Sequence, residues 1–338
     1  MKRISFIRTG SLLLASFFLP SYYRKPKLKI STVKGLIDAR KVGVCLVHEH
    51  ILVDFIGAEK YDPTRWNRAQ VVEKVISYLM ELKKNGCSTF MECTPEYLGR
   101  DVKLLRALSE KTGLNILTNT GYYGAGNNKY IPEKVFNISA KQLAEIWIKE
   151  YEEGIQGTSI KPGFIKIGVN PGPLSDFHEK LVRSAGLTHL STGLTITSHT
   201  GPSITAFSEI DVLKKLGVHP SAFIWIHAQN ENDWGTYVKA AKMGAWVSLD
   251  GLNDKNVNEY IERLFYMKDN GLLEKTLVSH DAGWYDPGKP EDGTFRNFNT
   301  LFEKLIPQLK SKGFTQEEIN QIMISNPVNA FSIRVRKI

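Results

Sequence analysis

The sequence is poor in cysteine. It holds only three in 338 residues, Cys45, Cys87 and Cys93. None forms a Cys-x-x-Cys motif, and an odd number cannot pair completely, so the pattern argues against a disulfide framework. Cysteine usually behaves as a small buried hydrophobe. We therefore expect these three side chains to be free and buried.

Excess charge is also missing from most of the chain. The formal net charge is +9, but residues 1–30 contain seven lysines and arginines and no acid, which leaves only +2 on the remainder. A nucleic-acid-binding domain carries its basic residues on a face of the folded domain. The charge distribution therefore gives no support for a nucleic-acid partner.

A long hydrophobic run is absent as well. The apolar stretch at positions 11–20 spans about ten residues, whereas a membrane-spanning helix needs about 20. A basic start followed by a short apolar run is typical of a secretory signal. We expect residues 1–25 to be a signal peptide or N-terminal leader and the mature protein to be exported, periplasmic or extracellular, with no stable membrane span. The alternative is a disordered or interfacial N-terminal arm.

The chain shows no linker, repeat or low-complexity segment, so residues 30–338 are expected to form a single domain. A short strand or hairpin is predicted at 30–38. After it, apolar runs alternate with segments of helical periodicity. The expected strands are 42–50, 88–94, 114–120, 164–169, 194–198, 222–226, 245–249 and 276–280. The expected helices are 65–84, 101–111, 139–151, 176–184, 203–216, 233–243, 256–270, 295–309 and 315–324. Eight strand–helix units predict an α/β fold, a closed (β/α)8 TIM barrel.

Polar side chains stand within or at the ends of these strands. His48 and His50 are two residues apart, so on a strand they point to the same side. The full set is His48, His50, Lys166, His199, His227 and Asp281. In a (β/α)8 barrel the C-terminal ends of the strands form the active-site mouth. The set therefore predicts two divalent metal ions, most simply Zn²⁺, with Mn²⁺, Co²⁺ or Fe²⁺ as alternatives. Such a pair can hold a bridging hydroxide and polarise a carbonyl or phosphoryl oxygen.

Lys166 is the unusual member, because an ammonium would be repelled by two cations. The site becomes consistent if Lys166 has reacted with CO2 to form a carbamate, whose two oxygens can bridge the metals. With the carbamate, Asp281 and a hydroxide, the two dications leave a charge of +1. An unmodified lysine would leave +3 in an enclosed pocket, which is costly.

These residues lie in motifs that resemble the phosphotriesterase family of the amidohydrolase superfamily. The matching segments run in order through nearly the whole mature chain. They are Gly43-Val-Cys-Leu-Val-His-Glu-His50, Gly99-Arg-Asp-Val-Lys-Leu-Leu105, Thr120-Gly-Tyr-Tyr123, Gly163-Phe-Ile-Lys-Ile167, Thr197-Ser-His-Thr200, Ile226-His227 and Val278-Ser-His-Asp281.

The resemblance implies roles for these residues. His48, His50 and Asp281 would hold the more buried metal, and His199 and His227 the more exposed one, with carboxylated Lys166 bridging both. Asp281 would also accept a proton during the attack. Tyr123 falls where lactonase-like members carry an active-site tyrosine, which favours a lactone or other carboxylic ester as the small-molecule substrate.

Gly251 departs from the family pattern, because lactonase-like members usually have arginine there and phosphotriesterases histidine. A phosphotriester or phosphodiester hydrolase therefore stays open as an alternative, as does a non-catalytic metal-binding barrel. A homodimer is compatible with the sequence but is not indicated by it.

The remaining polar residues receive simpler interpretations. His178, His189 and His219 are expected on the surface, and His280 as a packed histidine behind the site. Arg100 and Asp101 are expected to begin a helix. Glu92 is an alternative metal bridge, and Asp250 either orients a metal ligand or caps a helix. The loop Trp284–Gly293 is expected to overhang the pocket.

Overall fold

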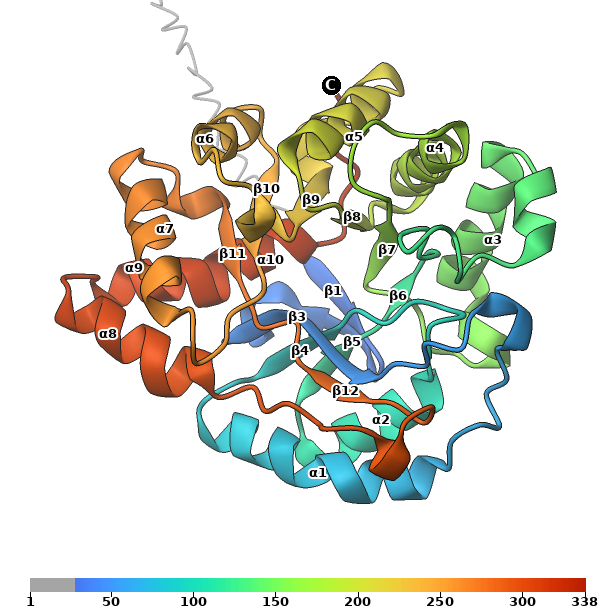
Figure 1. Ribbon diagram of the computed structural model, residues 1–338, viewed down its shortest axis with the longest axis horizontal. Coiled ribbons are helices and arrows are strands. Elements are labelled where there is room, and N and C mark those ends of the chain that lie inside the picture. Colours follow the sequence, from blue (N-terminus) through green and yellow to red (C-terminus); the bar gives the residue numbers. More distant parts are fainter. Residues whose placement is uncertain (1–27) are drawn as a thin grey trace, which may run out of the picture.

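The computed structural model describes residues 28–338, so the expected leader, residues 1–25, lies outside the described residues. Parallel strands form the centre of the molecule and helices surround them (Figure 1). No helix in this described part is long and apolar enough to cross a membrane.

The elements follow the predicted alternation. The strands are β1 (Lys29–Thr32), β2 (Gly35–Asp38), β3 (Cys45–Leu52), β4 (Thr89–Glu92), β5 (Asn115–Leu117), β6 (Asn119–Thr120), β7 (Phe164–Gly168), β8 (Thr195–His199), β9 (Phe223–Ile226), β10 (Trp246–Leu249), β11 (Thr276–Val278) and β12 (Gly283–Tyr285). The helices are α1 (Arg68–Lys84), α2 (Val102–Thr112), α3 (Ala140–Glu153), α4 (Asp176–Thr192), α5 (Ser203–Lys215), α6 (Gly235–Lys242), α7 (Val257–Asp269), α8 (Ile306–Ser311), α9 (Gln316–Asn320) and α10 (Asn326–Phe331).

Two sheets of parallel strands make up the barrel, in the orders β11-β10-β9-β8-β7-β6 and β12-β3-β4-β5. They meet at two seams, because β5 and β6 are successive parts of one chain segment, and so are β11 and β12. At the second seam the backbone N–H of Asp281 donates to the carbonyl of His48 at 3.0 Å. The barrel prediction is confirmed. The predicted strand 114–120 is split into β5 and β6, and β12 lies beyond the end of the predicted strand 276–280.

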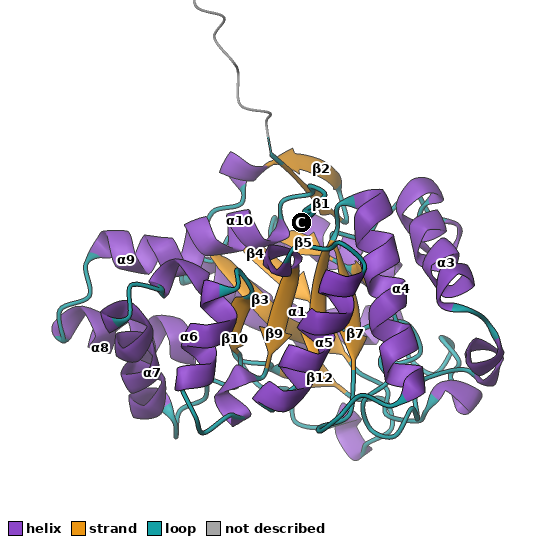
Figure 2. Ribbon diagram, turned by 90° about the horizontal axis from the view of Figure 1, so that it is seen from above, coloured by secondary structure: helices purple, strands orange, loops and turns teal. Residues whose placement is uncertain are grey.

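The two ends of the barrel differ. The antiparallel hairpin β1–β2 lies at the end opposite β12 and beside the C-terminal segment (Figure 2). Ile30, Val42, Cys45 and Phe331 belong to one buried apolar cluster there. The hairpin therefore closes the floor of the barrel, which leaves the strands' C-terminal ends as the open face.

Some helix boundaries differ from the predictions. The capping boxes Ser139–Gln142 and Thr315–Glu318 are both present, as expected. The predicted helix 295–309 is wrong in its first turn, because Arg296 exchanges backbone hydrogen bonds with Gly283 and the regular helix follows a π-helical turn at Leu301–Leu305. Helix α4 continues to Thr192, eight residues beyond the predicted end.

Two of the surface histidine predictions were wrong, and the longer α4 accounts for the one at His189. His178 and His189 are buried, not on the surface. His178 Nε2 lies 3.0 Å from Asn128 Oδ1, and His189 Nδ1 lies 2.7 Å from the carbonyl oxygen of Leu194. Both lie on the inner side of this helix, where a buried imidazole must find hydrogen-bond partners. His219 is partly exposed and caps the short turn at Pro220.

Candidate metal centre

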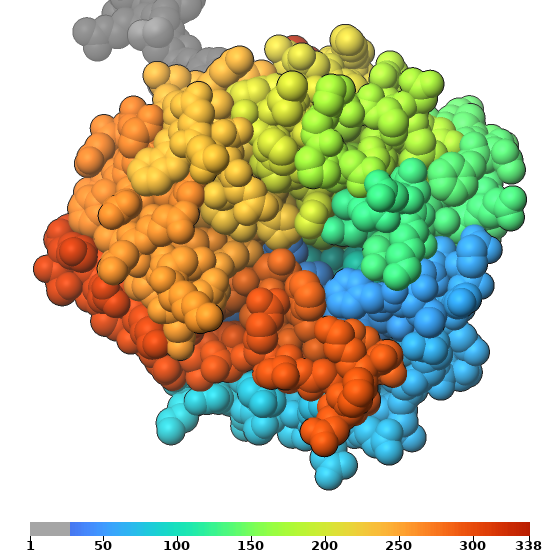
Figure 3. All heavy atoms as spheres, viewed as in Figure 1, coloured from blue at the N-terminus to red at the C-terminus, as the bar shows by residue number. Residues whose placement is uncertain are grey.

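A cavity opens at the C-terminal end of the barrel, and the space-filling view shows the hollow at the centre of that face (Figure 3). Its volume is about 440 Å³, which includes the open space at its mouth. All six predicted metal ligands and Tyr123 line it. The complete lining is His48, His50, Val53, Phe55, Cys93, Pro95, Leu98, Tyr123, Lys166, His199, His227, Asp281 and Trp284.

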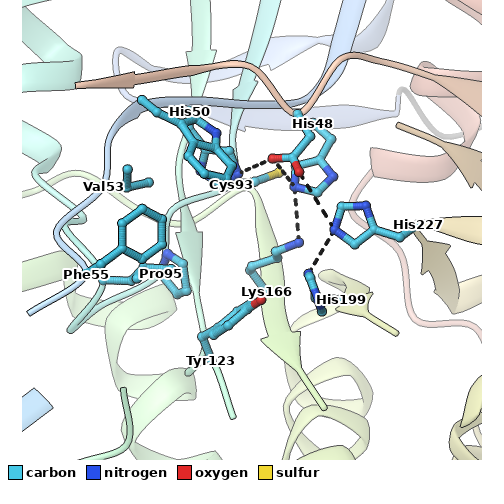
Figure 4. A pocket seen from close by; sticks show the side chains of 13 residues that line it. His48, His50, Val53, Phe55, Cys93, Pro95, Tyr123, Lys166, His199 and His227 are labelled. Atoms are coloured by element: carbon cyan, nitrogen blue, oxygen red, sulfur yellow. Dashed lines mark hydrogen bonds and ion pairs between the residues drawn. The ribbon is translucent and has the colours of Figure 1, made fainter. Parts of the chain in front are cut away.

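The six polar side chains come from five different strands or strand ends. The four histidines and Lys166 point toward one another (Figure 4). His50 Nε2 lies 3.0 Å from Asp281 Oδ1, and His48 Nε2 lies 3.8 Å from the same oxygen. Lys166 Nζ is 3.5 Å from His48 Nε2, and His227 Nε2 is 2.8 Å from His199 Nδ1. His48 and His50 therefore lie close to Asp281, although more than 230 residues separate them in the sequence.

Strained backbone positions two of these residues. His227 and Asp281 have positive φ angles of 61° and 54°. Such values are uncommon for residues other than glycine and cluster at functional sites. His227 directly follows β9, and Asp281 follows β11 by three residues. The turn at each position allows the side chain to line the cavity.

Asp250 holds two of the histidines. Its Oδ2 lies 3.0 Å from His48 Nδ1 and its Oδ1 lies 2.8 Å from His227 Nδ1. Ser248 Oγ and the backbone N–H of His227 donate to the same carboxylate. Because its oxygens already accept these hydrogen bonds, Asp250 is placed to orient His48 and His227, and it does not cap a helix. Burial alone would raise the pKa of Asp250, but His227 and His48 lower it well below its usual value.

A second arrangement fixes His50. Its Nδ1 lies 2.8 Å from Thr94 Oγ1, and the Thr94 hydroxyl donates to Glu92 Oε1 at 2.5 Å. Glu92 does not line the cavity, so it is not placed to bridge metals. Burial raises the pKa of Glu92 to about 7. Thr94 was not singled out from the sequence, because nothing in its local pattern distinguishes it from other strand threonines.

Glu49, between the two histidines of β3, points to the other side of the strand. Its carboxylate accepts hydrogen bonds from Ser279 Oγ and from the backbone N–H groups of His280 and Ala282. His280 Nδ1 lies 2.8 Å from Glu49 Oε1, so the prediction of a packed histidine is confirmed. Glu49 therefore fixes the turn that carries Asp281, a role that the alternation of the strand could have suggested.

The pKa shifts of the donors differ in direction: burial opposes protonation of His227, but Asp250 outweighs burial and raises its pKa. Burial, with Lys166 next in effect, lowers the pKa of His48 to about 4, and burial also lowers the pKa of Lys166. Neutral imidazoles carry the lone pair that a metal needs. Since Asp250 and Thr94 occupy Nδ1 of His48, His50 and His227, the Nε2 atoms of all three are left toward the cavity. In His199 it is Nδ1 that faces the group.

This donor set fits divalent metal ions. Four imidazoles and a carboxylate converge on the cavity, and these are common metal ligands. The Asp250 carboxylate and the Thr94 hydroxyl orient three of the imidazole rings, as such groups do in metalloproteins. Geometry alone identifies two clusters in the described part of the chain that could hold an ion, His48–His50–Asp281 and His48–His227–Asp250. The bonding of Asp250 to Nδ1 atoms makes the first cluster the better candidate.

Two glycines lie close to neighbouring side chains here, and the rigid Tyr123 ring makes the first of them the more tightly constrained. A Cβ at Gly168 would lie 2.8 Å from Tyr123 Cδ2, so glycine allows the Tyr123 ring to lie across β7 and beside His199. A Cβ at Gly251 would lie 2.7 Å from Gln229 Nε2, and the Tyr260 hydroxyl accepts from the Gly251 N–H. The position that differs from the family pattern is therefore filled by neighbouring side chains.

The predictions outside the site have mixed outcomes. Asp101 caps α2, as predicted, but Arg100 is buried and binds Glu150 instead of beginning the helix. The three cysteines are free and buried, as predicted, although Cys93 also lines the cavity. Within the Trp284–Gly293 loop, Trp284 lines both the cavity and an outer groove, and that groove is also lined by Asp286, Lys289, Pro290, Glu291 and Gly293.

Comparison with known proteins identifies the family. The model of the phosphotriesterase family matches residues 28–331. The phosphotriesterase homology protein of Escherichia coli is 28% identical, covering 86% of this chain and 98% of its own. An aryldialkylphosphatase of Saccharolobus solfataricus is 29% identical, covering 88% and 98%. An N-acetyltaurine hydrolase of Dictyostelium discoideum is 26% identical, covering 90% and 98%.

A solved structure supports the same assignment. The E. coli phosphotriesterase homology protein, with phosphate in its active site, superimposes with a TM-score of 0.74 at 27% identity, covering 86% of this chain and 99% of that one. The relatives named above include hydrolases, and the histidine and aspartate groups of the cavity could bind metal. The chain belongs to the phosphotriesterase family of metal-dependent hydrolases.

Proposed function

We propose that this protein is a binuclear-metal-dependent hydrolase that acts on a lactone or another carboxylic ester. The observation that carries the proposal is the convergence of six candidate metal-binding side chains on one cavity. The Nδ1 atoms of three of the histidines, which face away from the cavity, are already bonded to Asp250 or Thr94. The non-catalytic alternative is disfavoured because none of the expected donors is missing.

His48, His50 and Asp281 would hold one ion, and His199 and His227 the other, with Lys166 between them. When bound, the two ions would supply Lewis acidity toward a carbonyl oxygen and a low pKa for the attacking water. Most of the ligands are imidazoles, which suits zinc and also cobalt, iron or manganese.

Lys166 is proposed to be carboxylated. Its side chain is buried, and among residues 28–338 no carboxylate oxygen lies within 4.0 Å of its Nζ. Burial favours the neutral amine, whose lone pair can attack the carbon of CO2. A nitrogen–carbon bond forms, one C=O bond becomes a C–O⁻, and one proton leaves the nitrogen. The resulting carbamate has two oxygens that can reach both ligand groups.

Asp281 and Tyr123 are the residues proposed to act on the reacting groups. Burial opposes ionisation of Asp281, but His48 and His50 outweigh it and lower its pKa well below the usual value, so the carboxylate is charged and can accept a proton from the attacking water. The Tyr123 ring lies 5.1 Å from that of His199 at the cavity wall. Its hydroxyl is proposed to donate a hydrogen bond to a carbonyl-bearing substrate.

Two other substrate classes must be tested against the ester. A phosphotriester is suggested by the name of the S. solfataricus relative, and an N-acyl amide by the name of the D. discoideum relative. Both reactions can use the same metal and proton-accepting groups. The position of Tyr123 is what favours the carboxylic ester.

The test begins with elemental analysis of protein produced with added zinc or manganese. We expect about two metal ions per chain, and less than half an equivalent would contradict the binuclear proposal. The metal-loaded protein is then assayed with lactones, aryl esters, aryl phosphotriesters and N-acetyl amides. Metal-stripped protein serves as the control, and a clear preference for triesters or amides would overturn the ester proposal.

A further inference from the structure

Arg296 borders the outer groove beside the cavity, and its backbone fixes it there; Trp284 lines both the groove and the cavity. The N–H of Arg296 donates to the carbonyl of Gly283 at 2.9 Å, and its own carbonyl accepts from the Gly283 N–H at 3.1 Å. This pairing joins Arg296 to the first residue of β12, two positions after Asp281. The side chain then folds back, so that Nη2 donates to the carbonyl oxygen of Asp281 and Cζ lies 4.6 Å from the centre of the Trp284 ring.

The charge of Arg296 has no carboxylate partner within 4.0 Å in residues 28–338, and its side chain is exposed. Other charged residues near this loop are paired. Lys289 lies 3.7 Å from Asp286, and Lys74 lies 4.0 Å from Asp292. Glu291 borders the same outer groove but forms no ion pair with Arg296. A guanidinium has five N–H donors, so most of those of Arg296 are left for a ligand or water.

Trp284 adds a second unused donor beneath the guanidinium. The residue lines the cavity, and its Nε1 is buried without a hydrogen-bond partner in the described part of the chain. An indole N–H can only donate, and buried polar groups nearly always find a partner. The atom has almost no accessible surface, so a ligand oxygen in the cavity would bond it only after the Trp284 ring turns.

The surroundings leave few other places for a polar substrate group on this side. Trp284 packs against His50 and Phe55, with ring centres 5.9 and 5.5 Å apart. Val53, Pro95 and Leu98 complete the apolar wall. Trp284 therefore borders an otherwise apolar part of the cavity, and the guanidinium of Arg296 lies over its ring in the adjoining groove.

We propose that Arg296 and Trp284 form an anion-recognition pair, and that the substrate carries a carboxylate a few bonds away from the carbonyl that is hydrolysed. This inference rests on the proposed ester hydrolase. It specifies the substrate class: an anionic ester or lactone instead of a neutral one.

The first test compares two 4-nitrophenyl esters of nearly equal size, the hemisuccinate, which carries a carboxylate, and the butyrate, which does not. After subtraction of the uncatalysed rate, we expect the wild type to prefer the hemisuccinate by about tenfold in kcat/KM, the scale of a charge-assisted hydrogen bond. Arg296→Met should remove that preference, chiefly through KM, while changing butyrate hydrolysis by about twofold or less. Arg296→Lys should retain part of the preference, and Trp284→Phe should weaken it by a few-fold.

Lys289→Met is the matched control, because it removes a cation from the same loop that is already paired with Asp286. It should leave the preference unchanged. A wild type that does not prefer the hemisuccinate would overturn the inference. So would an Arg296→Met variant that loses equal activity on both esters, since Arg296 would then act only by supporting Asp281.

Binding measurements separate this inference from the proposed function. Calorimetric titration of the metal-loaded protein compares glutarate, with two carboxylates, and butyrate, with one. We expect glutarate to bind about tenfold more tightly to the wild type and the difference to disappear in Arg296→Met. If neither ester is hydrolysed, the ester proposal fails while this result still supports the anion pair. Equal binding of the two acids, or no effect of Arg296→Met, would overturn the pair itself.

Discussion

Two buried groups of charged side chains lie within this barrel, and they differ in what they leave unsatisfied. One is the set around Asp250 at the cavity. The other surrounds Arg100, whose side chain is fully buried. Arg100 Nη1 donates to Glu150 Oε2 at 2.9 Å and to the carbonyl of Asn119 at 2.8 Å, while Nη2 reaches Glu150 and Glu96.

Burial and shifted pKa values do not distinguish the two groups. Burial raises the pKa of Glu96, and both groups contain short ion pairs. The difference is direction. The Nη atoms of Arg100 bond to its carboxylates, and its buried Nε has no hydrogen-bond partner among the described residues. By contrast, His48, His50 and His227 bond outward through Nδ1 and direct Nε2 into a cavity. A functional site is therefore recognised by converging atoms that the protein leaves free.

The largest expected effect is at Lys166. Lys166→Ala should lose most bound metal and reduce kcat/KM by about 1000-fold or more, because the proposed bridge and about 4 kcal/mol of transition-state stabilisation disappear. Metal analysis and kinetics measure both. Lys166→Glu should keep more metal, and a short carboxylic acid should restore part of the activity of Lys166→Ala.

Lys161→Ala is the control for Lys166, since Lys161 is exposed just before β7. Its metal content and activity should match the wild type. Electron density at about 2 Å or better, the resolution at which added carboxyl atoms are visible, gives a direct check. A bare amine at Lys166 with both metals present would refute the carbamate.

Arg100→Met tests the other group. Breaking a buried ion pair costs about 3 kcal/mol or more, so the free energy of unfolding should fall by about that amount while metal content per folded chain stays unchanged. Urea denaturation measures the fall. Arg106→Met is the control, because the pair Arg106–Glu110 is exposed and should contribute less than about 1 kcal/mol. If folded Arg100→Met lost metal, the proposal that the Arg100 group only stabilises the fold would be contradicted.

Asp250→Asn should have a smaller effect on function. An amide cannot accept hydrogen bonds from both His48 and His227 with two oxygens, so metal affinity or activity should fall about 10- to 100-fold, as for other partners that orient ligands. Competition with a chelator measures the affinity. Asp254→Asn, at an exposed carboxylate paired with Lys304, should change nothing. An unaffected Asp250→Asn variant would mean that the carboxylate does not orient the site.

Tyr123→Phe should have the smallest and most selective effect. Loss of one hydrogen bond to the substrate should lower lactone turnover by about tenfold, with less effect on phosphotriester turnover. Tyr122→Phe is the control, because Tyr122 packs against Tyr97 and Trp147 away from the cavity. Equal losses on lactones and triesters in Tyr123→Phe would remove the argument for a carbonyl substrate.

The sequence predicted the barrel because alternating strands and helices leave a periodic trace in the chain. It also located the six polar residues of the cavity, since in such a fold the ends of parallel strands must meet at one face. Local patterns could not place Arg100 or His189, because whether a polar side chain is buried depends on the elements that pack over it. The expected helix at Phe295 failed for the same reason, since the pairing of Arg296 with Gly283 is a contact between distant segments.

What the sequence by itself determined is the type of each ligand and the strand end that carries it, because those depend on residue identity and on short-range periodicity. Only the tertiary structure decided how the ligands are held. Asp250 bonds to His48, which lies 202 residues away in the chain, and to His227, which lies 23 residues away. Glu92 is linked to His50 through the Thr94 hydroxyl. These bonds depend on distances of a few ångströms between strands, and no spacing along the chain encodes such distances.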